Sequence, residues 1–321
     1  MWIFIAIVSY LMNAGVYVAD KFLLSKKVHS SISYAFFVGI WSIFNFIILP
    51  LDFWVPTMRE LSLDLLAGLL FLLTLVVWYK ALHQSEATRV VPVVGALTPI
   101  FSFALSYIFF GAVFSEQQFL AFVILIIGGV LVSVKRTKMY VYKELSEKVR
   151  SIFGDVLGLV HAEYRPTRRL IANSLASAML FASYYVLMKY IFINQPFVGG
   201  FVWSRLGTFL GVLLMLFVSD WRRKIGEGQR GQKSPKNMSF FLGVRLFAAL
   251  AFILLNKAIS LGDVAMINAL QGTQFLFLIL LILLMSKKFP NILEEEMGHG
   301  VLFQKIMGII LVSLGLYVLV S

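Results

Sequence analysis

Two arginines lie inside otherwise apolar stretches of this sequence. Arg205 lies roughly eight residues inside the window 197–218, ~12 Å along a helix axis, and Arg245 lies about one and a half turns inside the window 239–259. An arginine this deep in hydrocarbon costs at least ~2.5 kcal/mol unless it faces a wet cavity or a partner. We therefore expect Arg205, with Arg245 as a second candidate, to bind a carboxylate or a phosphate. The alternatives are a structural pair, with a carbonyl or an acid such as Asp64, and snorkelling to the interface.

Neutral polar and aromatic side chains in the other apolar windows could complete a substrate-binding pocket. They are Asn13, Tyr17, Trp41, Tyr184 and Trp203, together with the amides Asn268, Gln271 and Gln274. The three amides recur every third residue, which places them along one face of a helix. Each amide either lines a cavity or bonds a neighbouring helix, and the alternative for the aromatic residues is anchoring at the membrane interface.

The remaining reactive residue types do not form a recognisable catalytic or metal-binding group. The sequence has no Cys, and its four His are scattered without a pair at ligand spacing, so we expect no metal site. The glycine-rich stretch 220–238 lacks the spacing of a phosphate-binding loop and suits a flexible solvated loop. All 16 Asp and Glu lie in loops or near predicted helix ends. We therefore expect no cofactor, no enzymatic activity and no acid at the membrane midplane.

These candidate residues require long apolar elements to hold them. Hydrophobic residues make up 60% of the chain and charged residues 14%. Crossing ~30 Å of hydrocarbon takes ~20 apolar residues in a helix. Suitable windows fall at about 2–24, 32–51, 62–82, 88–110, 116–134, 168–192, 197–218, 239–259, 263–286 and 302–320. The fold class predicted is an all-α integral membrane protein with about ten transmembrane helices.

The two halves of the chain repeat one another weakly but in order. Tyr17, Val18 and Lys21 recur as Tyr185, Val186 and Lys189; Trp41 and Ser42 recur as Trp203 and Ser204; Lys80 and Ala81 recur as Lys257 and Ala258. The matches indicate two five-helix repeats, 1–134 and 168–321. Because five is odd, the second repeat must enter the membrane from the opposite side, an arrangement suited to alternating access. The alternative is a duplication kept only for packing.

The segment 135–167 joins the repeats. Leu145, Val149, Ile152, Val156 and Leu159 recur at three- and four-residue spacing among basic residues. This pattern predicts an amphipathic helix on the membrane surface, or a linker helix packed on the bundle.

The first half resembles a known transporter family. Ala81, Leu82, the run Ala87–Arg89, the run Leu97–Phe101 and the closing Gly128 and Gly129 are similar to an EamA-type repeat of the drug/metabolite transporter superfamily. The second half is a looser match, at Ala258, Ile259, Gly262, Asp263 and the segment 268–277. The resemblance implies transport of a metabolite or a toxic compound. Unlike the family's usual pattern, Ala112 rather than a glutamate follows Gly111.

Basic residues set the predicted orientation. The formal net charge is +12, and most Lys and Arg fall in the connections that are cytoplasmic if both termini lie outside the cell membrane. This distribution explains the charge without nucleic acid as a partner.

The function predicted is transport of a small polar metabolite, an anion if Arg205 binds it, by alternating access. The expected partners are this small-molecule substrate and the lipid bilayer. The sequence leaves open whether the protein forms a homodimer. The alternatives are export of hydrophobic or cationic toxic compounds and a component of a lipid-linked substrate flippase. An intramembrane enzyme should bring His, Asp or Ser groups together at a membrane boundary, and the sequence shows no such group.

Overall fold

The computed structural model describes residues 1–24, 31–84, 87–133, 168–229, 235–286 and 299–320. These residues fold into helices and contain no strand. In the first half the helices are α1 (Trp2–Leu24), α2 (Ser31–Ile40), the 3₁₀ helix η1 (Trp41–Leu51), α3 (Met58–Gln84), α4 (Ala87–Phe110) and α5 (Glu116–Ser133). In the second half they are α7 (Arg168–Asn194), α8 (Phe197–Met215), α9 (Ser219–Gln229), α10 (Pro235–Leu261), α11 (Val264–Ala269), α12 (Gly272–Ser286) and α13 (His299–Val320).

Seven helical stretches of the described residues are long and apolar enough to cross a membrane. Three shorter apolar helices, Ala35–Leu51, Glu116–Val132 and Gln304–Val320, fall in three further windows expected from the sequence. The chain is therefore a multi-pass α-helical membrane protein, while the count of ten spans stays a prediction. The surface agrees with a lipid environment, because large apolar side chains such as Phe4 and Ile108 are about 70% exposed (72% and 69%).

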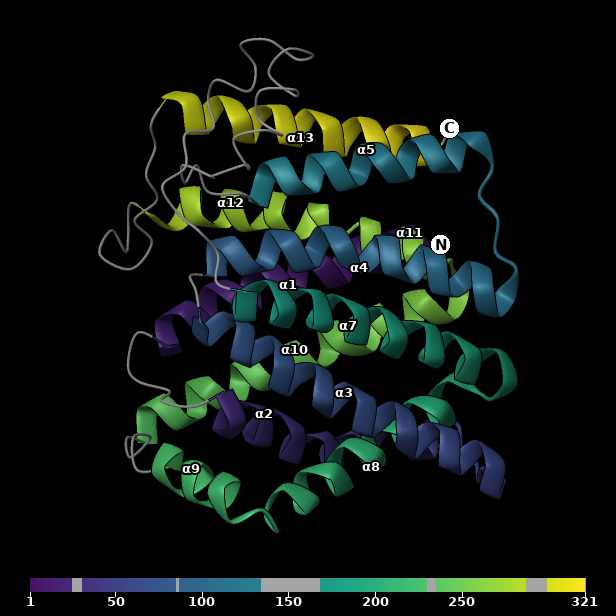
Figure 1. The fold of residues 1–321 in the computed structure, drawn as a ribbon, viewed down its shortest axis with the longest axis vertical. Coiled ribbons are helices and arrows are strands. Elements are labelled where there is room, and N and C mark those ends of the chain that lie inside the picture. Colours follow the sequence, from purple (N-terminus) through teal and green to yellow (C-terminus); the bar gives the residue numbers. More distant parts are fainter. Residues whose placement is uncertain (25–30, 85–86, 134–167, 230–234, 287–298, 321) are drawn as a thin grey trace.

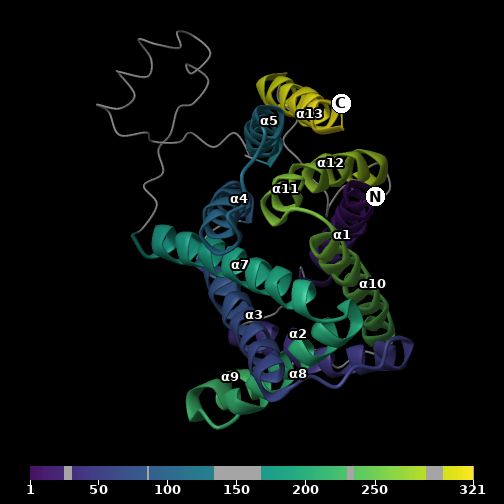
Figure 2. The same ribbon diagram turned by 90° about the vertical axis from the view of Figure 1, so that its right-hand side faces the viewer.

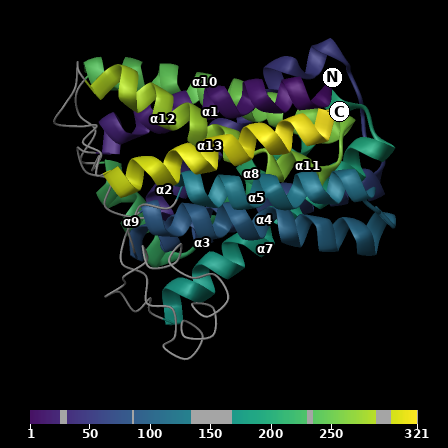
Figure 3. The same ribbon diagram turned by 90° about the horizontal axis from the view of Figure 1, so that it is seen from above.

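The helices run roughly side by side, and both termini lie at the same end of the bundle (Figures 1 and 3). We call this the terminal end. Seen along the helices, the α5–α13 pair lies at one edge, and α8 and α9 lie at the other (Figure 2). In between, α1 packs on α10 and α12, while α7 packs on α3 and α4. The two halves are thus interleaved rather than separate.

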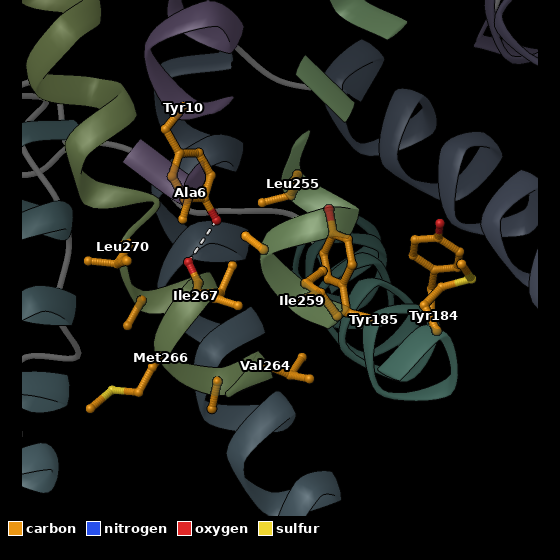
Figure 4. Packing of buried hydrophobic residues seen from close by; sticks show 14 of the residues in the cluster. Ala6, Tyr10, Tyr184, Tyr185, Leu255, Ile259, Val264, Met266, Ile267 and Leu270 are labelled. Carbon is orange, nitrogen blue, oxygen red and sulfur yellow. Dashed lines mark hydrogen bonds between the residues drawn. The ribbon is translucent and has the colours of Figure 1, made fainter. Parts of the chain in front are cut away.

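Two of the predicted spans are not continuous α-helices. The window 32–51 changes from α-helix to 3₁₀ helix at Trp41, and the window 263–286 is interrupted at Leu270 and Gln271. Tyr10 of α1 donates its hydroxyl to the carbonyl oxygen of Ile267 at 2.8 Å, beside this interruption (Figure 4). Since Gln271 N–H bonds Asn268 instead of Ile267, the tyrosine supplies the donor that the regular helix would have provided.

The structure differs from the loop predicted for 220–238. The sequence predicts a loop over 220–238, but α9 covers residues 220–229 and α10 begins at Pro235. Ile225 is buried and Trp221 partly buried against α2 and α8, and Ser33 donates to the carbonyl oxygen of Lys224. The sequence did not predict this helix, because its basic and glycine residues are typical of a solvated loop. The predicted interfacial helix in 135–167 lies outside the described residues.

Candidate functional site

Arg205 lies in the middle of the helix bundle. It is 2% exposed, although it belongs to the apolar helix α8. Its guanidinium carbon lies 4.5 Å from the ring centroid of Phe71, 5.1 Å from Phe252, 5.4 Å from Phe201 and 5.5 Å from Tyr184. The four rings come from α3, α10, α8 and α7. We call Arg205 and these four rings the arginine cage.

Among the described residues, a single side chain hydrogen-bonds the guanidinium. Nη2 donates to the Tyr184 hydroxyl at 2.7 Å, and that hydroxyl donates to Oδ1 of Asn256 on α10 at 3.4 Å. Nε of Arg205 is buried without a hydrogen-bond partner in the described part of the chain. No described carboxylate lies within ion-pair distance of Arg205. The cation is therefore held by ring faces and one neutral hydroxyl.

Close packing of α3 on α8 fixes the position of the cage. A Cβ added at Gly68 would lie 2.1 Å from the carbonyl oxygen of Ser204, and one added at Gly207 would lie 2.4 Å from that of Leu65. Thr208 also donates its hydroxyl to the carbonyl oxygen of Gly68 at 3.1 Å. These contacts bring the two backbones together, as small residues do between membrane helices. We call them the α3–α8 seam.

The arginine cage has the chemistry of an anion site. A guanidinium presents five donors in a planar fork, and a carboxylate or phosphate engages two of them at once. Aromatic faces stabilise the cation when no anion is present, at about 0.5–2 kcal/mol for each good contact. Nε of Arg205 is a buried donor without a partner, so it is available to donate a hydrogen bond to such an anion.

The structure brings two of the predicted site residues together, Arg205 and Tyr184. Trp203, on the same helix as Arg205, donates its indole N–H to the carbonyl oxygen of Trp54 at 2.9 Å. Trp41 of η1 stacks on Phe44, with ring centroids 5.1 Å apart. These two tryptophans lie outside the arginine cage.

The remaining predicted residues lie elsewhere. Tyr17 is partly exposed, Asn13 is half-buried on the same helix α1, and Arg245 of α10 is partly buried and has interactions of its own. Asp64, considered as a partner for the arginines, instead bonds Gln195.

Two of the three amides of the ninth window lie against α4. Asn268 is buried and donates to the hydroxyl of Ser102 at 2.7 Å. Gln271 lies close to Gly95, and Gln274 is buried on the other side of the helix interruption. Asn268 therefore takes the helix-bonding role, one of the two roles that the sequence left open for each amide.

Several residues near the site could not be predicted from the sequence. Phe71 and Phe252 belong to long apolar runs in which every phenylalanine has the same appearance, and Asn256 lies one turn from a helix end. Asp64 falls in the second turn of α3, where an acid is expected to be solvated, but it is 0% exposed. No signal in a single sequence identifies which of 30 phenylalanines face one arginine.

Comparison with known proteins addresses the family and the fold. A search of curated proteins finds no match to this chain. A solved structure described only as the crystal structure of a protein is 14% identical, covers 98% of this chain and 93% of its own, and superposes with a TM-score of 0.63. At that identity the likeness shows a shared fold.

The family comparison matches the first half of the chain. Residues 1–134 match the EamA-like transporter family. This match confirms the resemblance to an EamA-type transporter predicted from residues in the first half of the chain. Residues 1–134 are thus similar to the EamA-like transporter family.

Proposed function

We propose that this membrane protein transports a small polar anion, with Arg205 binding the carboxylate or phosphate of the substrate. The observation that carries the proposal is the burial of a guanidinium among four rings, with one neutral hydrogen-bond partner and an unpartnered Nε. A buried arginine kept for structure alone normally has an acid or several carbonyls as partners. A bound anion would supply the negative charge and the hydrogen-bond acceptor for Nε that this arginine lacks.

Alternating access is the mechanism that we propose, supported by how the two halves pack. In the proposed repeat α1 corresponds to α7, α3 to α10, and α4 to α12. The packing of α1 on α10 then corresponds to that of α7 on α3, and the packing of α1 on α12 to that of α7 on α4. All four contacts are present. The pairs α5–α13 and η1–α8 each map onto themselves. Such a relation, with five spans per repeat, is what an inverted repeat would produce.

One contact breaks the relation between the halves. α3 packs closely on α8, but α10 has no packing of comparable extent on α2 or η1 among the described residues. A transporter closed at one end and open at the other requires a difference of this kind. We infer that the α3–α8 seam is one of the two gates.

Export of cationic toxic compounds is less well supported than anion transport. A buried carboxylate at the binding site would favour it, but the charged residue in the cage is an arginine, and Asp64 lies in the second turn of α3 bonded to Gln195. A lipid-linked flippase would need an apolar groove open to the bilayer, and no described feature favours one.

Transport by reconstituted protein tests the proposal. Proteoliposomes are assayed against a panel of amino acids, sugars and phosphorylated metabolites, and the best substrate is then measured with variants. Arg205→Ala should lower transport at least thirtyfold, about the loss expected when one partner of a buried charge pair is removed. Arg205→Lys should restore only part of it, because an ammonium lacks the planar fork.

The matched control is Arg169→Gln, which removes an exposed positive charge from the first turn of α7. It should leave transport within twofold of the wild type, as expected for a solvated charge far from the substrate. Full transport by a folded Arg205→Ala protein would refute the role of Arg205. A substrate without an anionic group would refute the substrate class.

A further inference from the structure

A buried acid and a buried amide face each other near the terminal end of the bundle. Asp64 of α3 is 0% exposed and Gln195, between α7 and α8, is 6% exposed. Nε2 of Gln195 donates to Oδ1 of Asp64 at 3.1 Å. The second oxygen of each group, Oδ2 of Asp64 and Oε1 of Gln195, is buried with no hydrogen-bond partner among the described residues. Two facing groups thus leave one acceptor each unsatisfied.

One proton would satisfy both oxygens. Both oxygens of an ionised carboxylate can only accept hydrogen bonds, and so can an amide oxygen. Oδ2 of an ionised Asp64 and Oε1 of Gln195 therefore cannot bond each other. A protonated Asp64 has an O–H on Oδ2 that donates to Oε1 of Gln195. The planar acid and the planar amide then form a ring of two hydrogen bonds, which leaves no unpaired atom in the pair.

The charges around the pair do not favour a carboxylate. Glu60 lies one turn earlier in α3, and its charge has the same sign as that of an ionised Asp64. Glu60 is partly exposed and accepts hydrogen bonds from Thr57. A buried carboxylate without a cation is strongly unfavourable, so a group in this position takes up a proton.

Cations on the neighbouring helices are bound elsewhere. Lys189 of α7 donates to three carbonyl oxygens at the end of α10, those of Ile259, Ser260 and Gly262. Arg205 of α8 is held in the arginine cage, where its Nη2 bonds the titratable hydroxyl of Tyr184. Helix α2 carries no charged residue, and the arginine of α4 lies in its first turn, which follows the other end of α3 in the chain.

The pair lies against the α3–α8 seam. Leu65, next to Asp64, contacts Gly207 of α8, and Gly200 of α8 lies beside Oε1 of Gln195. Separation of α3 from the α7–α8 corner would therefore break the acid–amide pair and admit water to the carboxyl group.

We propose that Asp64 is a proton-binding site that couples proton transfer to opening of the α3–α8 seam. With the seam closed, the carboxylic acid is paired with Gln195. When the seam opens, the O–H bond of the acid breaks, the proton passes to water and the carboxylate is hydrated. The ligand of this site is a proton, and the coupling rests on the proposed transport function.

Infrared spectroscopy of the purified protein in lipid nanodiscs tests the protonation directly. At neutral pH the wild type should show the carbonyl band of a protonated carboxylic acid, and the band should disappear as the pH is raised. Asp64→Asn should lack the band at every pH while keeping the fold, since its amide can form the same two hydrogen bonds. Glu60→Gln is the control and should keep the band. A spectrum that Asp64→Asn leaves unchanged would overturn the proposal.

Thiol labelling tests the coupling to the seam. The chain has no native cysteine, so Ser204→Cys, at a fully buried position of the seam, is a unique reporter. Raising the pH by one unit through the transition seen in the infrared should speed labelling of this cysteine about tenfold more than in the Asp64→Asn background. Equal pH dependence in both backgrounds would overturn the coupling.

Neither measurement uses a substrate or alters Arg205. Failure of Arg205→Ala to affect transport, with the infrared band present, would remove the anion site alone. Absence of the band, with anion transport intact, would remove the proton site alone.

Discussion

At the scale of single residues, the arginine cage shows how a cation is kept within an apolar bundle. A guanidinium is more weakly hydrated than an ammonium and stacks on rings, so it loses less on burial. Phe71, Phe201, Phe252 and Tyr184 surround it with ring contacts between 4.5 and 5.5 Å. A lysine at this position would keep the charge and lose the stacking.

Tyr184→Phe should weaken the cage while leaving its rings in place. The substitution removes the hydroxyl that accepts from Arg205 at 2.7 Å. Hydrogen bonds to charged groups contribute about 1.5–3 kcal/mol, so the free energy of unfolding should fall by about that amount. Unfolding of the purified protein in detergent, followed by denaturant titration, measures the change.

The control for this prediction is Tyr190→Phe, which removes a hydroxyl from a partly exposed tyrosine of the same helix. Its unfolding free energy should stay within about 0.5 kcal/mol of the wild type. Equal effects of the two substitutions would mean that the bond to Arg205 contributes nothing to stability.

At the scale of helices, the α3–α8 seam and its missing counterpart follow from residue size. In the proposed repeat Lys80 and Lys257 occupy matching positions, and by that alignment Arg245 of α10 corresponds to Gly68 of α3. A glycine lets two backbones touch, whereas an arginine keeps them apart. Under this alignment the difference in residue size accounts for close packing of α3 on α8 without a counterpart of similar extent at α10 among the described residues.

Gly207→Ala should destabilise the protein by opening this seam. The new Cβ would lie 2.4 Å from a backbone oxygen of Leu65, which cannot move without displacing α3. Overpacking of this kind costs about 1–3 kcal/mol. Thermal unfolding in detergent should show a clear decrease in Tm relative to the wild type.

Gly243→Ala is the matched control, because a Cβ at that position of α10 would meet nothing within 4 Å. Alanine favours helix by up to about 1 kcal/mol over glycine, so Tm should stay the same or rise. A Gly207→Ala protein as stable as the Gly243→Ala protein would show that α3 and α8 are not in close contact.

At the scale of the whole molecule, the two halves form one interleaved bundle with both termini at one end (Figure 1). The segment between α4 and α5 lies at the terminal end, and α9 lies at the opposite end. If the basic residues mark the cytoplasmic side, the terminal end faces outward.

Cysteine labelling in intact cells should confirm this orientation. Val113→Cys, between α4 and α5, and Ser219→Cys, at the start of α9, each add one thiol at an exposed position of a cysteine-free chain. A membrane-impermeant reagent should modify the first variant in intact cells and the second only after permeabilisation. The reverse result would mean that the termini lie in the cytoplasm.

The sequence alone determined the helical membrane class, the approximate bounds of the apolar windows and two members of the arginine cage. It could do so because hydropathy, helix length and the cost of a buried charge are local properties of the chain. Arg205 was identifiable in this way because one charge in an apolar run stands out.

Only the tertiary structure decided which residues meet. Phe71, Phe252 and Asn256 join Arg205 from helices far apart in the chain, and Asp64 meets Gln195 across 131 positions. The interruption at Leu270 likewise depends on a donor from α1, Tyr10. These features depend on distances between helices, which the periodicity of any one segment does not contain.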